Sequence, residues 1–123
     1  MARILVIDDD AQVRLYLKQL LERNGYEVTE APDGRQGIAR FRSGGIDLVI
    51  TDIIMPDKEG LETISDLRDI DPDVKIIAIS GGGRRQPDDY LKMAESFGAA
   101  RALPKPIDRA ELLGTLKQLL APA

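Results

Sequence analysis

Residues 3–10, with the sequence RILVIDDD, decide the fold class of this chain. Four consecutive aliphatic residues run directly into three aspartates. An unbroken aliphatic run is typical of a strand that is buried on both faces of a parallel sheet. Two further segments, residues 47–51 and 74–79, have the same apolar character. The pattern therefore predicts three inner strands, at residues 3–7, 47–51 and 74–79.

Two weaker strands complete the predicted sheet. Residues 26–30 alternate apolar and polar side chains, which indicates a strand with one wet face. Residues 99–103 form a short apolar segment that meets Pro104. A strand with a wet face and a strand next to proline both fit the edges of a sheet.

Amphipathic segments separate the strands and predict helices. Three of them span residues 10–23, 58–70 and 87–97. Another begins at the turn of residues 32–34 and ends at residues 43–45, and the last follows its capping residue Asp108. In the segment at residues 87–97, the side chains expected to face inward are Tyr90, Met93, Ala94 and Phe97. This alternation predicts an α/β fold, a doubly wound five-stranded parallel sheet of (βα)5 type with the flavodoxin-like strand order 2-1-3-4-5.

The composition bounds what the chain can do. Its 123 residues predict one domain, residues 1–123, and 43% hydrophobic content is enough for a core. The longest apolar runs have four residues and no secretory signal opens the chain, so a cytoplasmic location without membrane contact is expected. A net charge of −4 argues against direct nucleic-acid binding. With no Cys and no His, thiol chemistry, zinc–thiolate sites and histidine-based catalysis are excluded.

Polar residues follow four of the predicted strands. Asp8 and Asp9 follow the first, Asp52 the third, Ser80 the fourth and Lys105 the fifth. In such sheets, ligands bind beyond the carboxyl ends of the strands. Taken singly, each residue has a plainer explanation: an acid in a turn, a loop hydroxyl or a surface cation. Asp10, the next residue along, is assigned only as the cap of the first helix.

The combination of these carboxylates with a single lysine indicates a metal ion. Clustered carboxylates repel one another unless a cation compensates, and one lysine cannot balance three acids. Because every available ligand is oxygen, the ion is expected to be hard, and Mg²⁺ fits. A carboxylate, a lysine, a hydroxyl and Mg²⁺ around one point are the parts needed for phosphoryl transfer, with Asp52 as the nucleophile.

These motifs resemble the receiver domain of two-component response regulators, of the single-domain, CheY-like kind. The motifs are IDD at residues 7–9, TDIIMPDKEG at residues 51–60, Ser80, and Lys105 followed by Pro106. The resemblance covers essentially the whole chain. It implies a signalling protein of a phosphorelay, not an enzyme acting on a separate substrate, although it assists its own phosphorylation and dephosphorylation. The implied partners are a sensor histidine kinase or phosphotransfer protein and a downstream protein target.

The resemblance also implies a role for each site residue. Asp52 corresponds to the phosphoacceptor, and Asp8 and Asp9 correspond to the acids of a Mg²⁺ site that Asp52 and the backbone carbonyl of Ile54 complete. Ser80 corresponds to the hydroxyl that bonds the phosphoryl group and moves on activation, and Lys105 to the lysine that pairs with that group. A cis peptide bond between Lys105 and Pro106 is implied as well.

Some positions depart from the family pattern. Ala102 stands where an aromatic residue usually turns inward during the switch, and residues 81–85 form an unusually glycine-rich loop, GGGRR. Ile54 and Gly82 occupy two positions that help to set the hydrolysis rate in the family. Neither can orient a water molecule by hydrogen bonding, so a comparatively long-lived phosphorylated state is expected.

Three alternatives stand beside this interpretation. A flavodoxin-type FMN carrier would need a phosphate-binding loop after the first strand, where three aspartates would repel the phosphate. A hydrolase of the haloacid-dehalogenase type would have a second Asp where Ile54 stands. A receiver-like interaction module that is never phosphorylated is the third.

The chain is expected to act as a free-standing regulator. The other interpretation is a receiver domain excised from a longer protein.

Overall fold

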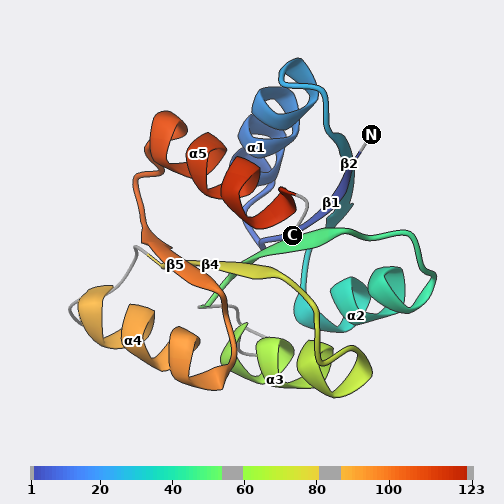
Figure 1. Ribbon diagram of the computed structural model, residues 1–123, viewed down its shortest axis with the longest axis vertical. Helices are drawn as coiled ribbons and strands as arrows, with labels where there is room; N and C mark the ends of the chain where they lie inside the picture. The colour runs from blue at the N-terminus through green and yellow to red at the C-terminus, as the bar shows by residue number, and fades with distance from the viewer. Residues whose placement is uncertain (1, 54–59, 81–86, 122–123) are drawn as a thin grey trace.

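A central parallel sheet organises the molecule (Figure 1). The computed structural model describes residues 2–53, 60–80 and 87–121, except for the side chains of residues 87–91. The strands are β1 (Arg3–Ile7), β2 (Glu27–Ala31), β3 (Leu48–Asp52), β4 (Ile76–Ser80) and β5 (Arg101–Pro104). Their order is β2-β1-β3-β4-β5 and every neighbouring pair is parallel. The predicted fold class, strand order and edge strands are therefore confirmed.

Helices cover both faces of the sheet. They are α1 (Ala11–Arg23), α2 (Gly34–Arg42), α3 (Gly60–Ile70), α4 (Pro87–Phe97) and α5 (Arg109–Leu120). Helices α1 and α5 lie on one face, and α2, α3 and α4 lie on the other (Figure 1). In the described part of the chain, no helix has both the length and the apolar character needed to cross a bilayer.

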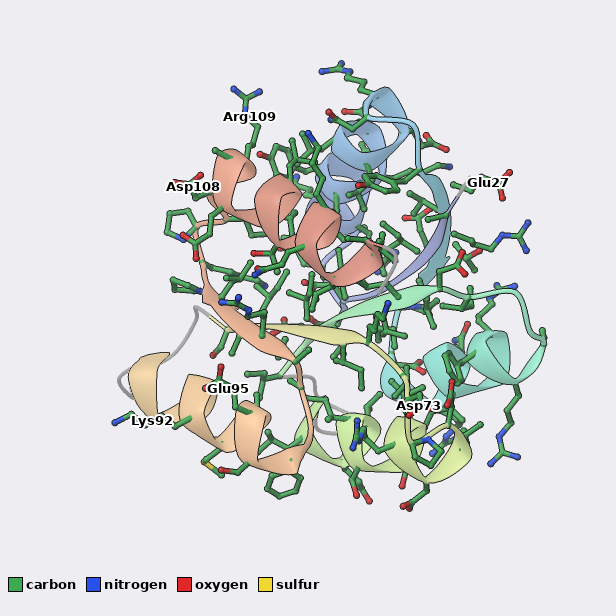
Figure 2. All side chains as sticks on the ribbon, viewed as in Figure 1. Glu27, Asp73, Lys92, Glu95, Asp108 and Arg109 are labelled. Atoms are coloured by element: carbon green, nitrogen blue, oxygen red, sulfur yellow. The ribbon has the colours of Figure 1, made fainter. Side chains whose placement is uncertain are left out.

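Three aspartates start helices in the way that their positions predict. The carboxylates of Asp10, Asp33 and Asp108 accept hydrogen bonds from the backbone N–H groups two or three residues further on. Each bond satisfies an N–H group that has no partner within the helix, and a negative charge at this end favours the helix dipole. Figure 2 shows Asp108 and its neighbour Arg109 at the start of α5. The assignment of Asp10 as a cap is confirmed.

The core has two halves, one on each face of the sheet. Alternate residues of the inner strands point to opposite faces, as the two-residue period of a strand requires. Leu5, Ile7 and Val49 pack with side chains of α2, α3 and α4, whereas Ile4 and Val6 pack with α1 and α5. Strands β1, β3 and β4 are buried almost throughout, which explains their unbroken apolar sequences.

The expected inner face of α4 is partly wrong. Ala94 is fully buried, but the side chains of Met93 and Phe97 are 43% and 46% exposed. Helix α4 is the last helix on its face of the sheet, beside edge strand β5 (Figure 1). With a neighbouring helix on one flank only, it buries a narrow stripe that runs through Ala94. The side chain of Tyr90, expected to face inward, lies outside the described residues.

Several element boundaries differ by one or two residues from those expected. Strand β4 begins at Ile76 instead of residue 74, because the Val74 N–H bonds to Asp71 O in the preceding turn. Strand β5 begins at Arg101 instead of residue 99, because the Ala99 N–H bonds to Ala94 O at the end of α4. Backbone hydrogen bonds of the turns therefore decide where these strands begin.

Candidate functional site

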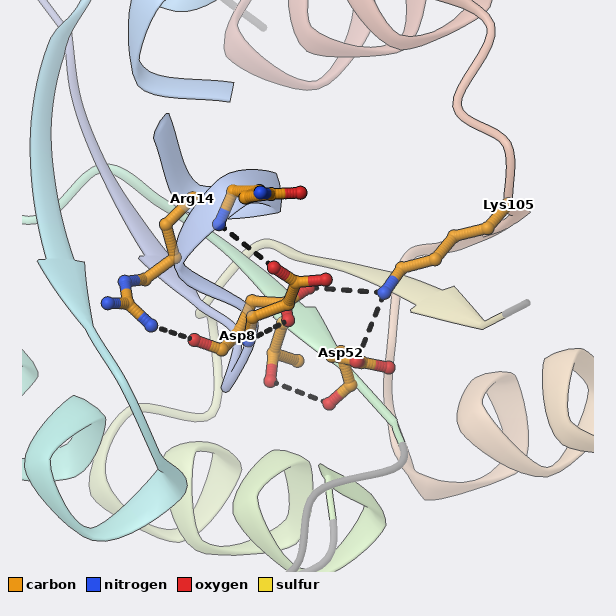
Figure 3. A network of polar contacts seen from close by, with 7 residues as sticks. Asp8, Arg14, Asp52 and Lys105 are labelled. Atoms are coloured by element: carbon orange, nitrogen blue, oxygen red, sulfur yellow. Dashed lines mark hydrogen bonds and ion pairs between the residues drawn. The ribbon is translucent and has the colours of Figure 1, made fainter. Parts of the chain in front are cut away.

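The site lies at the carboxyl end of the sheet, where β1, β3, β4 and β5 end (Figure 3). Asp8 follows the last residue of β1, and Asp52 is the last residue of β3. Because parallel strands share one carboxyl edge, residues far apart in the sequence meet there. The arrangement brings together three of the residues singled out from the sequence: Asp8, Asp52 and Lys105.

Lys105 joins the two buried carboxylates. Its Nζ donates hydrogen bonds to Oδ2 of Asp8 and to Oδ2 of Asp52, at 3.2 Å each. Asp8 is 2% exposed and Asp52 is 7% exposed. Burying carboxylates is costly unless they are paired, so the ammonium is the compensating charge that the described residues supply.

Asp8 is held by its backbone as well as by its side chain. Its Oδ1 accepts a hydrogen bond from the backbone N–H of Asp10 at 2.9 Å, and its own N–H donates to Ala31 O at 3.2 Å. The first contact forms a tight turn that leads directly into α1. The candidate site is therefore built into the junction between β1 and α1.

The ionisation of the site reflects its burial. Desolvation raises the pKa of Asp8 above its usual value, and the nearby charge of Asp52 raises it further, against the lowering effects of the Asp10 N–H and Lys105. Burial lowers the pKa of Lys105, but the carboxylates of Asp52 and Asp8 outweigh burial and raise that pKa overall. The folded protein therefore disfavours the ionised form of Asp8, whereas it favours the charged form of the neighbouring Lys105.

Three carboxylates lie close together at the site. One oxygen each of Asp8, Asp9 and Asp52 lie within 4.8 Å of one another. Asp9 is exposed, whereas Asp8 and Asp52 are buried. The set of three acids and one ammonium carries an excess of negative charge and consists of oxygen donors, which fits a hard divalent cation. Ile54, whose carbonyl was expected to complete the site, lies outside the described residues.

Ser80 and Lys105 are linked through their backbones. Ser80 ends β4 with 1% exposure, and its carbonyl accepts a hydrogen bond from the Lys105 N–H at 2.9 Å. The peptide bond between Lys105 and Pro106 is cis, as expected. Ala102 is half-buried on β5, opposite Ala78. The glycine-rich loop expected at residues 81–85 lies outside the described residues.

One residue at the site was missed in the sequence. Arg14, in the first turn of α1, donates a hydrogen bond from Nη1 to the carbonyl oxygen of Asp8 at 2.6 Å (Figure 3). Its Nε lies 3.6 Å from Oε1 of Glu30 at the end of β2. The available signal was an arginine one helical turn after the capping Asp10, but its partner is a backbone atom, which carries no sequence signature.

The geometry agrees with the comparisons with known proteins. Residues 4–117 match the family described as the response regulator receiver domain. The chain belongs to this family and is a CheY-like receiver domain of a two-component system. Receiver domains are signalling domains, which confirms the expected class of function.

Three relatives illustrate the likeness. The chemotaxis protein CheY of Treponema pallidum is 34% identical over 96% of this chain and 82% of its own. A receiver domain protein from Clostridium thermocellum superposes with a TM-score of 0.90 at 32% identity, covering 98% of this chain and 94% of its own. The response regulator TrrA of Thermotoga maritima, solved in complex with Mg²⁺-BeF, has a TM-score of 0.84 at 36% identity, covering 98% and 100%. Some curated relatives are longer, and the chain spans only 24% or 16% of their length.

Proposed function

We propose that Asp52 accepts a phosphoryl group from the phosphohistidine of a sensor histidine kinase or phosphotransfer protein. The observation that supports this best is the bridge from Lys105 to Asp52 and Asp8, 3.2 Å from each. In this bridge, the carboxylate that we propose as the nucleophile lies beside an ammonium group at the carboxyl end of the sheet. The resulting state of the protein would be read by a downstream protein target.

In the proposed step, a carboxylate oxygen of Asp52 attacks the phosphorus atom as the phosphorus–nitrogen bond of phosphohistidine breaks. The electron pair of that bond returns to the imidazole nitrogen. Lys105 would pair with the charge of the phosphoryl oxygens, as cations do in other phosphoryl transfers. The Ser80 hydroxyl, in the buried residue that ends β4, would bond the same group.

Asp8, Asp9 and Asp52 are the proposed ligands of Mg²⁺, together with the carbonyl of Ile54. The three carboxylates lie close enough to share one ion. Two of them, Asp8 and Asp52, are buried, and a bound cation would offset the cost of that burial. A bound Mg²⁺ would supply charge neutralisation for the phosphoryl oxygens. The Mg²⁺-BeF complex of TrrA, a protein 36% identical to this chain, supports the proposal.

The proposal extends to the whole chain. Residues 1–123 would act as a single receiver domain that signals through a conformational switch, with Ala102 in place of the usual aromatic residue. It would also take phosphoryl groups from small donors and assist their later hydrolysis. The cytoplasmic location stays a prediction.

Intact-mass measurement after incubation with acetyl phosphate and Mg²⁺ tests the proposal. The parent protein is expected to gain one phosphoryl group, and both Asp52→Asn and omission of Mg²⁺ are expected to abolish the gain. Asp73→Asn, at an exposed turn, is the matched control and should be phosphorylated like the parent. Phosphorylation of Asp52→Asn at the parental rate would contradict the assignment. No phosphorylation of the parent by any donor would favour an interaction module that is never phosphorylated.

A further inference from the structure

Arg14 connects three elements at the edge of the candidate site. Its Nη1 donates to the Asp8 carbonyl at 2.6 Å, and its Nε lies 3.6 Å from the Glu30 carboxylate. The backbone N–H of Arg14 donates a hydrogen bond to Asp10 O at 3.0 Å, so the residue belongs to the first turn of α1. The side chain is only 18% exposed. A guanidinium held at several points in this way restricts the groups that it touches.

The Asp8 carbonyl belongs to the peptide group that joins Asp8 to Asp9. The other polar groups of Asp8 also have partners: its N–H bonds to Ala31, and its two carboxylate oxygens bond to Asp10 and Lys105. Asp9 differs, because no hydrogen bond within the described part of the chain holds its carboxylate. The orientation of the Asp8–Asp9 peptide group sets the position of the Asp9 Cα and so limits where the Asp9 carboxylate can lie.

The contact is strong enough to set that orientation. A hydrogen bond from a charged donor is shorter and roughly twice as strong as a neutral one, and 2.6 Å is short for a nitrogen–oxygen pair. Glu30 lies near the guanidinium on the side of β2 and helps to hold it in place. Partial burial limits competition from water for the Asp8 carbonyl.

We infer that Arg14 is a positioning residue that orients the Asp8–Asp9 peptide group and so presets Asp9 for Mg²⁺. This inference rests on the proposed function, because it needs Asp9 to be a metal ligand. Within the described part of the chain, the contacts of the Arg14 side chain are with the Asp8 carbonyl and the Glu30 carboxylate, and not with the carboxylates of the candidate metal site. Its effect passes through one backbone carbonyl.

Charge alone predicts the opposite effect, which makes the inference testable. Arg14 is a cation near a site that is expected to bind a cation, so its removal would strengthen Mg²⁺ binding if charge were its only influence. If Arg14 positions Asp9, its removal weakens binding. The sign of the change therefore separates the two roles.

Titration calorimetry with Mg²⁺ alone provides the test. Arg14→Gln is expected to weaken Mg²⁺ binding by about tenfold, the lower end of the usual effect of losing a residue that supports metal ligands. Lys18→Gln is the matched control: it removes the same charge from the same helix, and Lys18 lies 3.9 Å from Glu30 without contacting Asp8. Its affinity should equal or slightly exceed that of the parent.

A second readout does not depend on Mg²⁺. In NMR spectra without metal, Arg14→Gln should shift the carbonyl carbon of Asp8 and the amide of Asp9, and Lys18→Gln should leave both in place. Arg14→Lys retains the positive charge but lacks the planar guanidinium group with its several N–H donors. It should therefore also bind Mg²⁺ more weakly than the parent. Folding of each variant is checked by circular dichroism.

The outcomes separate the two proposals. If the parent binds Mg²⁺ and a folded Arg14→Gln variant binds it as tightly or more tightly, the inference fails and the proposed function stands. If the parent binds no Mg²⁺, the proposed metal site is wrong and the inference falls with it. Weaker binding by Arg14→Gln, unchanged binding by Lys18→Gln and a shifted Asp8 carbonyl resonance would support both.

Discussion

Asp8 is a buried acid whose negative charge is only partly balanced by its neighbours. It is 2% exposed, its carboxylate faces that of Asp52, and Lys105 is shared between the two. Its raised pKa shows that the folded state favours the protonated form more than the unfolded chain does. Residues that serve a ligand often carry such a cost to stability.

A pH dependence follows from this raised pKa. The favourable contribution of protonated Asp8 is complete below the unfolded pKa of 3.8 and is lost as the pH rises through the higher folded pKa. Asp8→Asn has no such titration. Without Mg²⁺, the free energy of unfolding of the variant should therefore gain on that of the parent as the pH rises from about 4 to 7.

Urea unfolding at several pH values measures this difference, with Asp73→Asn as the control for loss of a carboxylate away from the site. The quantity compared is the free energy of unfolding of Asp8→Asn minus that of the parent. If this difference stays constant with pH, or falls towards pH 7, Asp8 is not the destabilising acid.

We also expect two single residues to influence the lifetime of the proposed phosphorylated state. Ile54 and Gly82, both outside the described residues, carry no polar side chain that could orient the attacking water. Combining Ile54→Asn with Gly82→Glu would supply polar groups at both positions. Because a well-placed group can change a rate by about 10²-fold, dephosphorylation of the double variant should be measurably faster.

Loss of phosphate is followed by intact mass, with saturating Mg²⁺ and no kinase. Equal rates in the double variant and the parent would remove the explanation for a long-lived phosphorylated state.

At the level of secondary-structure elements, the start of α3 lies against the backbone at the end of β3. The Gly60 N–H donates to Ile53 O at 2.7 Å. A Cβ at Gly60 would overlap the carbonyl oxygen of Asp52 and the backbone of Ile53. Because these are main-chain atoms, they cannot move aside without displacing the residue that bears the proposed nucleophile.

Gly60→Ala should therefore destabilise the protein, by about 1–3 kcal/mol, as expected for overpacking. It should also slow phosphorylation of Asp52. Gly114→Ala is the matched control, because Gly114 lies in α5 with open space around its Cα. That substitution should stabilise the protein by about 0.5–1 kcal/mol through helix propensity.

Urea unfolding and the phosphorylation assay measure both effects. If Gly60→Ala is as stable as Gly114→Ala and is phosphorylated at the parental rate, the backbone at the end of β3 can shift to accommodate a side chain at the start of α3.

At the scale of the whole molecule, a metal ion at the candidate site would link two inner strands. Asp8 and Asp9 follow β1, and Asp52 ends β3, between the two halves of the core. An ion held by these residues binds the folded protein and finds no comparable site in the unfolded chain. Binding therefore adds directly to global stability.

Mg²⁺ at about 100 times its dissociation constant should raise the free energy of unfolding by about 2.7 kcal/mol. Thermal unfolding monitored by circular dichroism measures the increase. Asp9→Asn should lose most of it, and Asp73→Asn should retain it. An equal rise in all three proteins would indicate nonspecific binding of the ion.

The fold and most of the site follow from local features of the sequence. Unbroken apolar runs at Ile4–Ile7 and Ile76–Ile79 identify inner strands, because only burial on both faces favours such runs. Parallel strands then bring their carboxyl ends together by geometry alone, so the sequence predicts that Asp8, Asp52 and Lys105 meet at one site.

Other features depend on tertiary packing. Met93 and Phe97 have the helical spacing of core residues, but the position of α4 at the end of its layer leaves them exposed, and no local pattern encodes that position. Arg14 looks like any surface arginine in sequence, yet it holds the Asp8 carbonyl. The sequence by itself determined which polar side chains reach the candidate site, because residue type and strand order follow from local patterns. Only the tertiary structure decided which backbone atoms hold those side chains, because contacts to the main chain depend on three-dimensional proximity and not on residue identity.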